Sequence, residues 1–183
     1  MEDYKMSDFF ELCEKRQSCR KYTGEKVAHE KLAKIAEAAR LTPSGCNAQP
    51  WKFIFVESED KVQVVAKACQ SFEGINKYTD TAGAFVVVLE EYAVLNPHVR
   101  RVFDSQYFAK NDCGAAVVTI CYAAEDIGVA SCIIGLFDRE TLEKELDISR
   151  ESRIHMVIAL GYPDSPNVRK KARKEISDII KFA

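Results

Sequence analysis

The amino-acid sequence predicts an α+β fold, in which helices cover the faces of a central sheet. The expected helices come first and the strands are few, so the chain lacks the regular strand–helix alternation of a doubly wound sheet. The run AFVVVLEE, beginning at Ala84, opens with six consecutive apolar residues, which is typical of a strand buried on both faces. A length of 183 residues suits one domain, 1–183, with a core that needs no disulfide or metal.

The first half of the chain is expected to contain three helices and one strand. Ser7 can cap a helix that runs to about Arg16, with Asp8 in its first turn. WKFIFVE at 51–57 is aromatic and β-branched, which favours a strand. Two further helices, at about 28–41 and 59–70, are predicted by apolar residues that repeat on one helical face: Leu32, Ile35, Ala36 and Ala39 in the first, and Val62, Val65, Ala66 and Cys69 in the second.

The second half is expected to begin with helix from about Val99 to Ile127, in one or two pieces, ended by Gly128. The stretch 115–121 is apolar on nearly every side, so this helix should be central and enclosed. Asp138 can cap a helix to about Leu146, and RIHMVIALGYP should form a further strand. The last residues, EISDIIKFA, are too apolar for a free end and are expected to dock on another surface.

Composition and charge exclude several classes of protein. The chain has 26 basic and 28 acidic residues, a net charge of −2, which argues against nucleic acid as the main partner. Its longest apolar runs fall short of the ~20 residues of a membrane helix, and its acidic beginning lacks a signal-peptide pattern. Seven scattered cysteines without a C-x-x-C pair, and three histidines without metal spacing, predict neither disulfides nor a metal site. The scattered, unpaired cysteines favour a cytoplasmic location, where thiols stay reduced.

Two segments carry groups that could bind a ligand. RQSCRKY at 16–22 places Arg16, Ser18 and Arg20 on one side of an extended chain, where guanidinium groups could hold a phosphate. The alternative is a solvated basic patch at a helix C-terminus. TPSGCNAQPW at 42–51 is a rigid turn that offers the polar side chains Ser44, Asn47 and Gln49, and glycine for close approach of a ligand. The alternatives there are an ordinary turn and, for Cys46, a packing role in place of a reactive thiol.

Two later segments are less informative. GVASCIIGLFD at 128–138 could present main-chain N–H groups to a ligand, but by its sequence it is better interpreted as a buried connector. RKKARK at 169–174 is either solvated or completes a phosphate site begun by Arg16. The sequence contains neither a P-loop nor a G-x-G-x-x-G fingerprint.

Taken together, these segments resemble the motifs of the FMN-dependent nitroreductase family, in the same order and spacing. RQSCRKY resembles the family's opening R-x-S-x-R/K, and TPSGCNAQPWKF resembles its P-S-x-x-N-x-Q-P-W turn. The stretch from Asp112 to GVASCIIGLFD resembles its long central helix and following loop, and GYP with KAR at 171–173 resembles its closing motifs. The likeness extends from about residue 16 to 175.

The resemblance implies a mainly antiparallel sheet and a homodimer that binds FMN at its interface and exchanges C-terminal segments. Arg16, Lys171 and Arg173 would hold the FMN phosphate, with Gln17 and Ser18 nearby, and Arg20 would lie at the N1 and O2 edge of the ring. Two further sets of contacts with the flavin are expected. One set comes from the other subunit: Pro43, Ser44, Gly45 and Asn47. The other is the backbone of Ile133, Ile134 and Gly135, with the Gly135 N–H near N5. No catalytic side chain and no metal ligand are implied.

The implied activity is a ping-pong, two-electron reduction of nitroaromatic, quinone or related small-molecule acceptors with NADH or NADPH as donor. A fixed cation such as Arg20 would stabilise the negative charge of the reduced ring. One alternative is a protein that stores or senses FMN, and another is a relative specialised in flavin breakdown or dehalogenation. Three residues depart from common family patterns, Gln17, Gly135 and Ala172, and the short span 90–110 predicts an open pocket.

Overall fold

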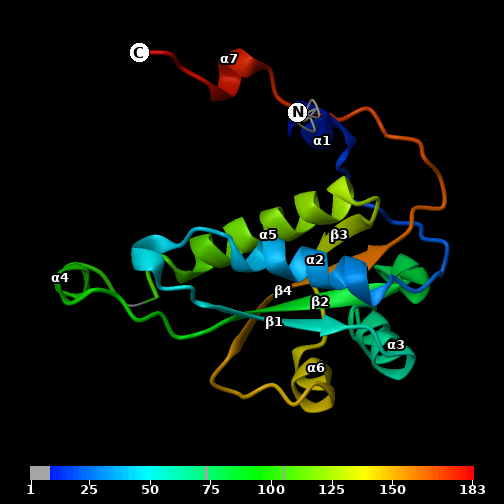
Figure 1. Cartoon of the computed structure of the whole chain (residues 1–183), viewed down its shortest axis with the longest axis horizontal. Helices are drawn as coiled ribbons and strands as arrows, with labels where there is room; N and C mark the ends of the chain where they lie inside the picture. Colours follow the sequence, from blue (N-terminus) through cyan, green and yellow to red (C-terminus); the bar gives the residue numbers. More distant parts are fainter. Residues whose placement is uncertain (1–8, 73, 105) are drawn as a thin grey trace, which may run out of the picture.

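The centre of the protein is a four-stranded antiparallel sheet, seen in a computed structural model that describes residues 9–72, 74–104 and 106–183 (Figure 1). Its strand order is β1-β2-β4-β3, and each neighbouring pair is antiparallel. The strands are β1 (Trp51–Val56), β2 (Ala84–Glu90), β3 (Ala130–Ile134) and β4 (Arg153–Gly161). The sheet and its covering helices confirm the predicted α+β class.

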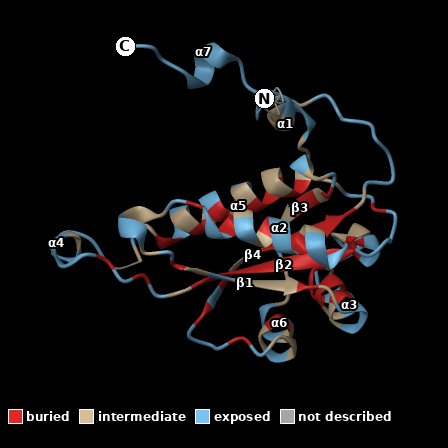
Figure 2. Ribbon diagram, in the orientation of Figure 1, coloured by how far each residue is buried: buried red, intermediate tan, exposed pale blue. Residues whose placement is uncertain are grey.

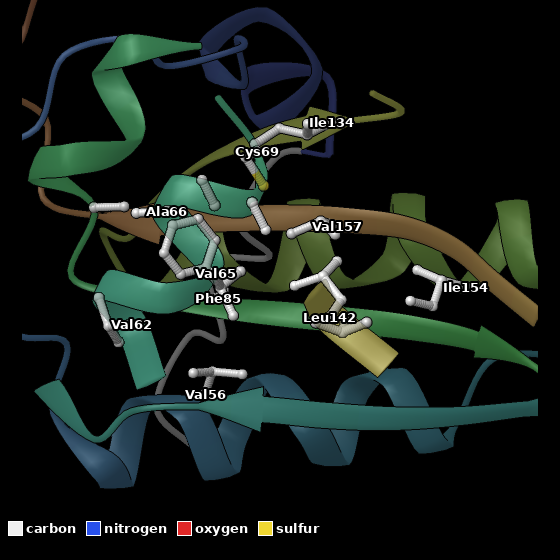
Figure 3. Packing of buried hydrophobic residues seen from close by; sticks show 14 of the residues in the cluster. Val56, Val62, Val65, Ala66, Cys69, Phe85, Ile134, Leu142, Ile154 and Val157 are labelled. Carbon is white, nitrogen blue, oxygen red and sulfur yellow. The ribbon is translucent and has the colours of Figure 1, made fainter. Parts of the chain in front are cut away.

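Helices cover both faces of this sheet (Figure 2). Successive residues of β2 point to opposite faces, and all seven are buried: the six apolar residues, as the apolar run predicts, and Glu90 in addition. On one face Phe85 packs with α3 and α6 (Figure 3), and on the other Val86 packs with α2 and α5. The helices are α1 (Phe9–Lys15), α2 (His29–Arg40), α3 (Glu59–Ala68), α4 (Pro97–Arg100), α5 (Ala109–Asp126), α6 (Arg139–Glu145) and α7 (Ile176–Ile179).

Most of the predicted helices and strands are present within a few residues of their expected limits. The side chain of Asp138 caps α6 by accepting hydrogen bonds from the N–H groups of Glu140 and Thr141. Gly128 ends α5 with φ +73°, a left-handed conformation that glycine adopts without strain. Ser7 and Asp8, the expected cap of the first helix, lie outside the described residues.

Two expectations are wrong. The interpretation of 128–138 as a connector fails, because Ala130–Ile134 is a strand that pairs with β4. Its five residues are too few to show a strand period, and it is the pairing with distant segments that makes it a strand. The helix at 115–121 is also not enclosed, since Val118 of α5 is 48% exposed. One side of α5 therefore remains open in the single chain.

Both ends of the described chain lie away from the sheet, on the side of α1 and α5 (Figure 1). α1 packs on α5, where the Phe9 ring lies 5.3 Å from that of Tyr122. The final segment extends past α1 and leaves Ile176, Ile179 and Phe182 largely exposed. No helix in the part of the chain that the structure describes is both long and apolar enough to cross a membrane.

Candidate functional site

The segment after α1 is held against the open edge of the sheet. Ser18 forms a parallel bridge with Ser131 of β3, and the Cys19 N–H donates to the Ser131 carbonyl at 2.9 Å. Residues 16–20 therefore extend along β3, as the expected alternation of their side chains requires. Arg16 is half-buried beneath this segment, and Arg20 is exposed.

The C-terminal segment returns to the same place through long-range hydrogen bonds. The Gln17 amide donates to the Asn167 carbonyl at 2.9 Å and accepts from the Arg169 backbone N–H at 3.2 Å. The Arg169 guanidinium donates to Gln17 Oε1 at 3.0 Å and to the Ser18 carbonyl at 2.6 Å. Lys171 Nζ donates to the carbonyls of Cys13 and Glu14, which are in the last turn of α1 and attract a cation.

These two segments enclose a cavity of about 260 Å³ whose lining is strongly positive. Among the described residues that line it, none is a carboxylate, and two are neutral, Gln17 and Ser18. The other six are Arg16, Arg20, Arg169, Lys170, Lys171 and Arg173. Both cationic clusters of the sequence therefore meet in one place, and all the residues expected at the phosphate lie there.

The cavity fits a phosphate group by charge and by hydrogen-bonding capacity. Cations this close repel one another unless an anion lies between them. The Nε and Nη2 atoms of Arg16 are buried without an oxygen or nitrogen acceptor within the described chain, and the neighbouring Cys121 thiol is only a weak partner for this guanidinium. A buried donor without an acceptor is costly, and an anion that reaches this guanidinium would remove that cost.

A second cavity, of about 320 Å³, continues from the first and shares Gln17, Ser18, Arg20 and Arg169 with it. Glu125, near the end of α5, lines this second cavity. Burial raises the pKa of Glu125 above its ordinary value, and the nearby Arg16 and Lys171 partly oppose that rise. An acidic group therefore stands just outside the cationic cavity.

The turn 42–51 lies at the other end of α5 and is held by different forces. Cys46, Asn47 and Gln49 all have left-handed backbones, with φ between 49° and 55°. Such conformations cost about 1–3 kcal/mol each in residues other than glycine, so surrounding contacts must maintain them. The Ser44 hydroxyl accepts from the Gln49 N–H at 2.9 Å, which closes the turn.

Gly45 joins this turn to the first turn of α5. Its N–H donates to the Asp112 carboxylate, with both oxygens at 3.2 Å. A Cβ atom on Gly45 would lie 3.2 Å from Cβ of Phe108, so the glycine allows close approach of that side chain. Pro43, Ser44, Gly45 and Asn47 are thus presented together on a constrained turn. The sequence motifs assign no role to Phe108, and Asp112 enters them only as the start of the stretch that resembles the central helix.

The turn and the cationic cavity are separated within one chain. Asp112 and Glu125 mark the two sites and lie thirteen residues apart on α5, which corresponds to roughly 20 Å. Ile133, Ile134 and Gly135 lie nearer the cavity, at the end of β3 whose start is bridged to Ser18. Gly135 is exposed just beyond that strand. The single chain therefore brings the cationic cavity and β3 together, and holds the turn apart.

The groups that could hold a metal ion are not gathered in the described chain. Across residues 9–72, 74–104 and 106–183, no three His, Cys, Asp or Glu side chains come together at such a site. The seven cysteines all lie in these residues as free thiols. Burial raises the pKa of Cys19, which lines the second cavity, and a raised pKa disfavours the reactive thiolate.

An antiparallel sheet between helix layers defines an α+β protein, and the cationic cavity at the edge of the sheet is suited to an anion. Residues 13–162 match the model of the Nitroreductase family, so the chain belongs to that family. It is 28% identical over 181 residues to the iodotyrosine deiodinase of Thermotoga neapolitana, covering 93% of this chain and 96% of that protein. It is also 29% identical, over an alignment of 205 positions, to the oxygen-insensitive NADPH nitroreductase of Helicobacter pylori. This alignment covers 93% of this chain and 94% of that protein.

Solved structures show the same fold. A nitroreductase from Exiguobacterium sibiricum, solved in complex with FMN, matches with a TM-score of 0.81 at 20% identity, covering 97% of this chain and 98% of that one. A nitroreductase family protein from Clostridium difficile matches with a TM-score of 0.77 at 25% identity, covering 96% and 98%. The resemblance given by the sequence motifs is therefore confirmed at the level of family and fold.

Proposed function

We propose that this chain is an FMN-dependent oxidoreductase that oxidises NADH or NADPH and reduces nitroaromatic, quinone or related acceptors. The observation that carries the proposal is the cavity with six cations and no carboxylate among its described lining residues. A phosphate monoester supplies the charge that this lining lacks. Membership of the nitroreductase family, and the FMN complex of a relative with the same fold, support FMN as the source of that phosphate.

Within this proposal, the cavity binds the phosphate and β3 aligns the ring. Arg16 offers its unsatisfied N–H groups, and Lys171 and Arg173 add charge from the C-terminal segment. Ser18 offers a hydroxyl between them. Arg20 lines both cavities and is free to reach beyond the phosphate toward the N1 and O2 edge of the ring. Ile133, Ile134 and Gly135 supply backbone groups along the ring.

A second copy of the chain completes the proposed site. Pro43, Ser44, Gly45 and Asn47 are held away from the cavity of their own protomer, so the partner's turn would line the ring. The open side of α5 and the exposed apolar C-terminal residues support this arrangement, because apolar surface of that extent is covered in most proteins. The C-terminal segment would cross to the partner beyond Arg173.

Bound FMN would supply the two-electron chemistry between the nicotinamide and the acceptor. The residues of the chain bind and orient it. Arg20 places a positive charge where negative charge accumulates on reduction, and the constrained turn offers neutral hydrogen-bonding groups without charge of its own. No side chain is required to act as a general acid or base.

The proposal is tested by purifying the full chain and measuring bound flavin by absorbance and by its release on denaturation. We expect a yellow protein with about one FMN per chain, and NADH or NADPH oxidation that accelerates when a nitroaromatic or quinone is added. A colourless preparation that gains no FMN on reconstitution would contradict the proposal. A protein that binds FMN but turns over no acceptor would instead be a storage or sensor protein.

The likeness to the Thermotoga neapolitana iodotyrosine deiodinase supports one further acceptor class. Halogenated phenols, with iodotyrosine as the probe, therefore belong among the acceptors tested. Release of iodide during NAD(P)H oxidation would identify reductive dehalogenation, and reduction of nitroaromatics without iodide release would favour the leading proposal. The two activities share the same cofactor site, and the residues near the acceptor would distinguish them.

A further inference from the structure

Gln17 stands in the middle of the cationic cavity, yet its amide is occupied by the C-terminal segment. It donates to the Asn167 carbonyl and accepts from the Arg169 N–H, on either side of Val168. A neighbouring parallel strand would make this same pair of bonds with an extended segment. The side-chain amide therefore fixes residues 167–169 against the sheet edge without a further strand.

Arg169 completes the connection from the other side. Its guanidinium donates to the Gln17 side chain at 3.0 Å and to the Ser18 carbonyl at 2.6 Å. A guanidinium used in this way has fewer donors left for a ligand than Arg16, whose Nε and Nη2 have no oxygen or nitrogen acceptor within the described chain. The six cations of the cavity are thus not equivalent.

We propose that Gln17 and Arg169 form a clasp that positions the phosphate site, and that neither is itself a main phosphate ligand. The clasp is the pair of side chains with their bonds to Asn167, Arg169 N–H and Ser18. It fixes the segment just before Lys171 and Arg173, so that both of these reach the cavity from the same protomer. The phosphate half of the site is then complete in one chain before the C-terminal segment departs.

This inference rests on the proposed function, because the probe is FMN. Riboflavin, which lacks the phosphate, is the matched control probe. Gln17→Met keeps the size of the side chain and removes its hydrogen bonds. Arg169→Met removes one positive charge and the guanidinium bonds of the clasp, and it leaves the two bonds between Gln17 and the backbone of 167–169. Lys170→Met removes one positive charge from the same cavity without touching the clasp. Dissociation constants are measured on the full chain freed of flavin, by quenching of flavin fluorescence.

We expect Gln17→Met and Arg169→Met each to weaken FMN binding about fivefold to tenfold, since partly exposed hydrogen bonds contribute modestly. Riboflavin binding should change less than twofold. In the Gln17→Met background, Arg169→Met should add no more than the loss of one positive charge, because residues in one hydrogen-bond network are not additive. Lys170→Met, which removes one positive charge from the same cavity, should keep its full effect in that background and sets the size of this loss. A full additional loss from Arg169→Met in that background would overturn the clasp and make Arg169 an independent ligand.

Trypsin provides a readout that needs no flavin. Cleavage after Lys170 and Lys171 should be several-fold faster in Gln17→Met than in the unmodified chain, while the midpoint of thermal unfolding stays unchanged. An unchanged cleavage rate would overturn the clasp. If the unmodified chain bound neither FMN nor riboflavin, the proposed function would fail, and the cleavage rate alone would decide the clasp.

Discussion

The two ends of α5 carry two candidate binding regions that are built in opposite ways. At its C-terminal end, the cationic cavity is assembled from residues about 150 positions apart, joined by partly exposed hydrogen bonds. At its N-terminal end, the turn 42–51 consists of consecutive residues with left-handed backbones, anchored by Asp112. The first region is strongly charged and is assembled from distant segments, and the second is a constrained turn without a charged residue.

This difference suggests a division of the binding free energy. A charged cavity gains most from the phosphate, because charge-assisted hydrogen bonds are the stronger kind. A constrained, neutral turn has already lost its conformational entropy, so it can contact a ring without further cost. Changes in the cavity should therefore affect FMN alone, and changes in the turn should affect FMN and riboflavin alike.

The largest expected effect is that of Arg16→Met. Loss of the half-buried guanidinium removes the donors that lack an oxygen or nitrogen acceptor, and FMN affinity should fall about 100-fold, the equivalent of one strong charge-assisted contact. Riboflavin affinity should change little. Fluorescence titration measures both. Arg150→Met, an exposed cation that lines a different cavity, is the control and should leave both affinities unchanged. Equal losses of affinity for FMN and riboflavin would contradict the expectation that the cavity binds the phosphate and the turn binds the ring.

Asp112→Ala examines the other end of the helix. It removes the acceptor of the Gly45 N–H and an acidic group from the first turn of α5, so the free energy of unfolding should fall by about 2 kcal/mol. FMN and riboflavin should both bind roughly 30-fold more weakly, because 1.4 kcal/mol corresponds to a factor of ten. Denaturant unfolding and flavin titration measure the two effects.

The matched control is Asp126→Ala, which removes an acidic group from the last turn of the same helix. That position is unfavourable for a carboxylate, so stability should stay the same or rise slightly. If Asp112→Ala lowered FMN affinity without lowering riboflavin affinity, the turn would act through the phosphate. That result would contradict the expectation that the turn binds the ring.

The same difference between the two regions explains which parts of each can be predicted from the sequence. The cations at 16–20 and 169–174 are visible because each cluster is contiguous, and the structure brings them together. The Gln17–Arg169 contact leaves no pattern, since an amide side chain has many partners and this one lies 152 positions away. The motifs also do not show that Asp112 and Phe108 contact the turn, since these contacts depend on the packing of α5 against it.

The same reasoning applies to the fold. The strand at Ala84–Glu90 is predictable because its own residues are apolar on both faces. Ala130–Ile134 is not, because its state depends on β4 on one side and Ser18 on the other. For Gly45, the sequence predicts close approach of a ligand but not the close approach of Phe108 that the structure shows. Nonlocal packing therefore decides the cases of Ala130–Ile134 and Gly45.

Arg20 lies between the two kinds of region, since it is exposed and lines both cavities. Arg20→Ala should weaken FMN binding about tenfold and make the midpoint potential of bound flavin more negative, because a cation near the reduced ring is lost. Lys21→Ala is the comparison, since Lys21 is paired with Asp164 at 2.5 Å and lines the second cavity but not the first. An unchanged potential in Arg20→Ala would remove Arg20 from the ring and leave it with the phosphate.

The smallest expected effect comes from Glu125→Gln, and it depends on pH. Burial raises the pKa of Glu125 above its ordinary value of 4.5, so the folded state binds its proton more tightly than the unfolded state does. The contribution of Glu125 to stability is therefore complete below pH 4.5 and is lost as the pH rises through the raised folded value. Glu125→Gln should abolish this part of the pH dependence, which denaturant unfolding at several pH values measures.

The same substitution should tighten FMN binding about twofold at neutral pH, because it removes a negative charge that competes with the phosphate for Arg16 and Lys171. Below the raised pKa the two proteins should bind FMN equally, since Glu125 is then neutral as well. Riboflavin should show no difference at any pH. Weaker FMN binding in Glu125→Gln would mean that this carboxylate holds the two cations in place for the phosphate, and the cavity would then owe its rigidity to an acidic residue outside it.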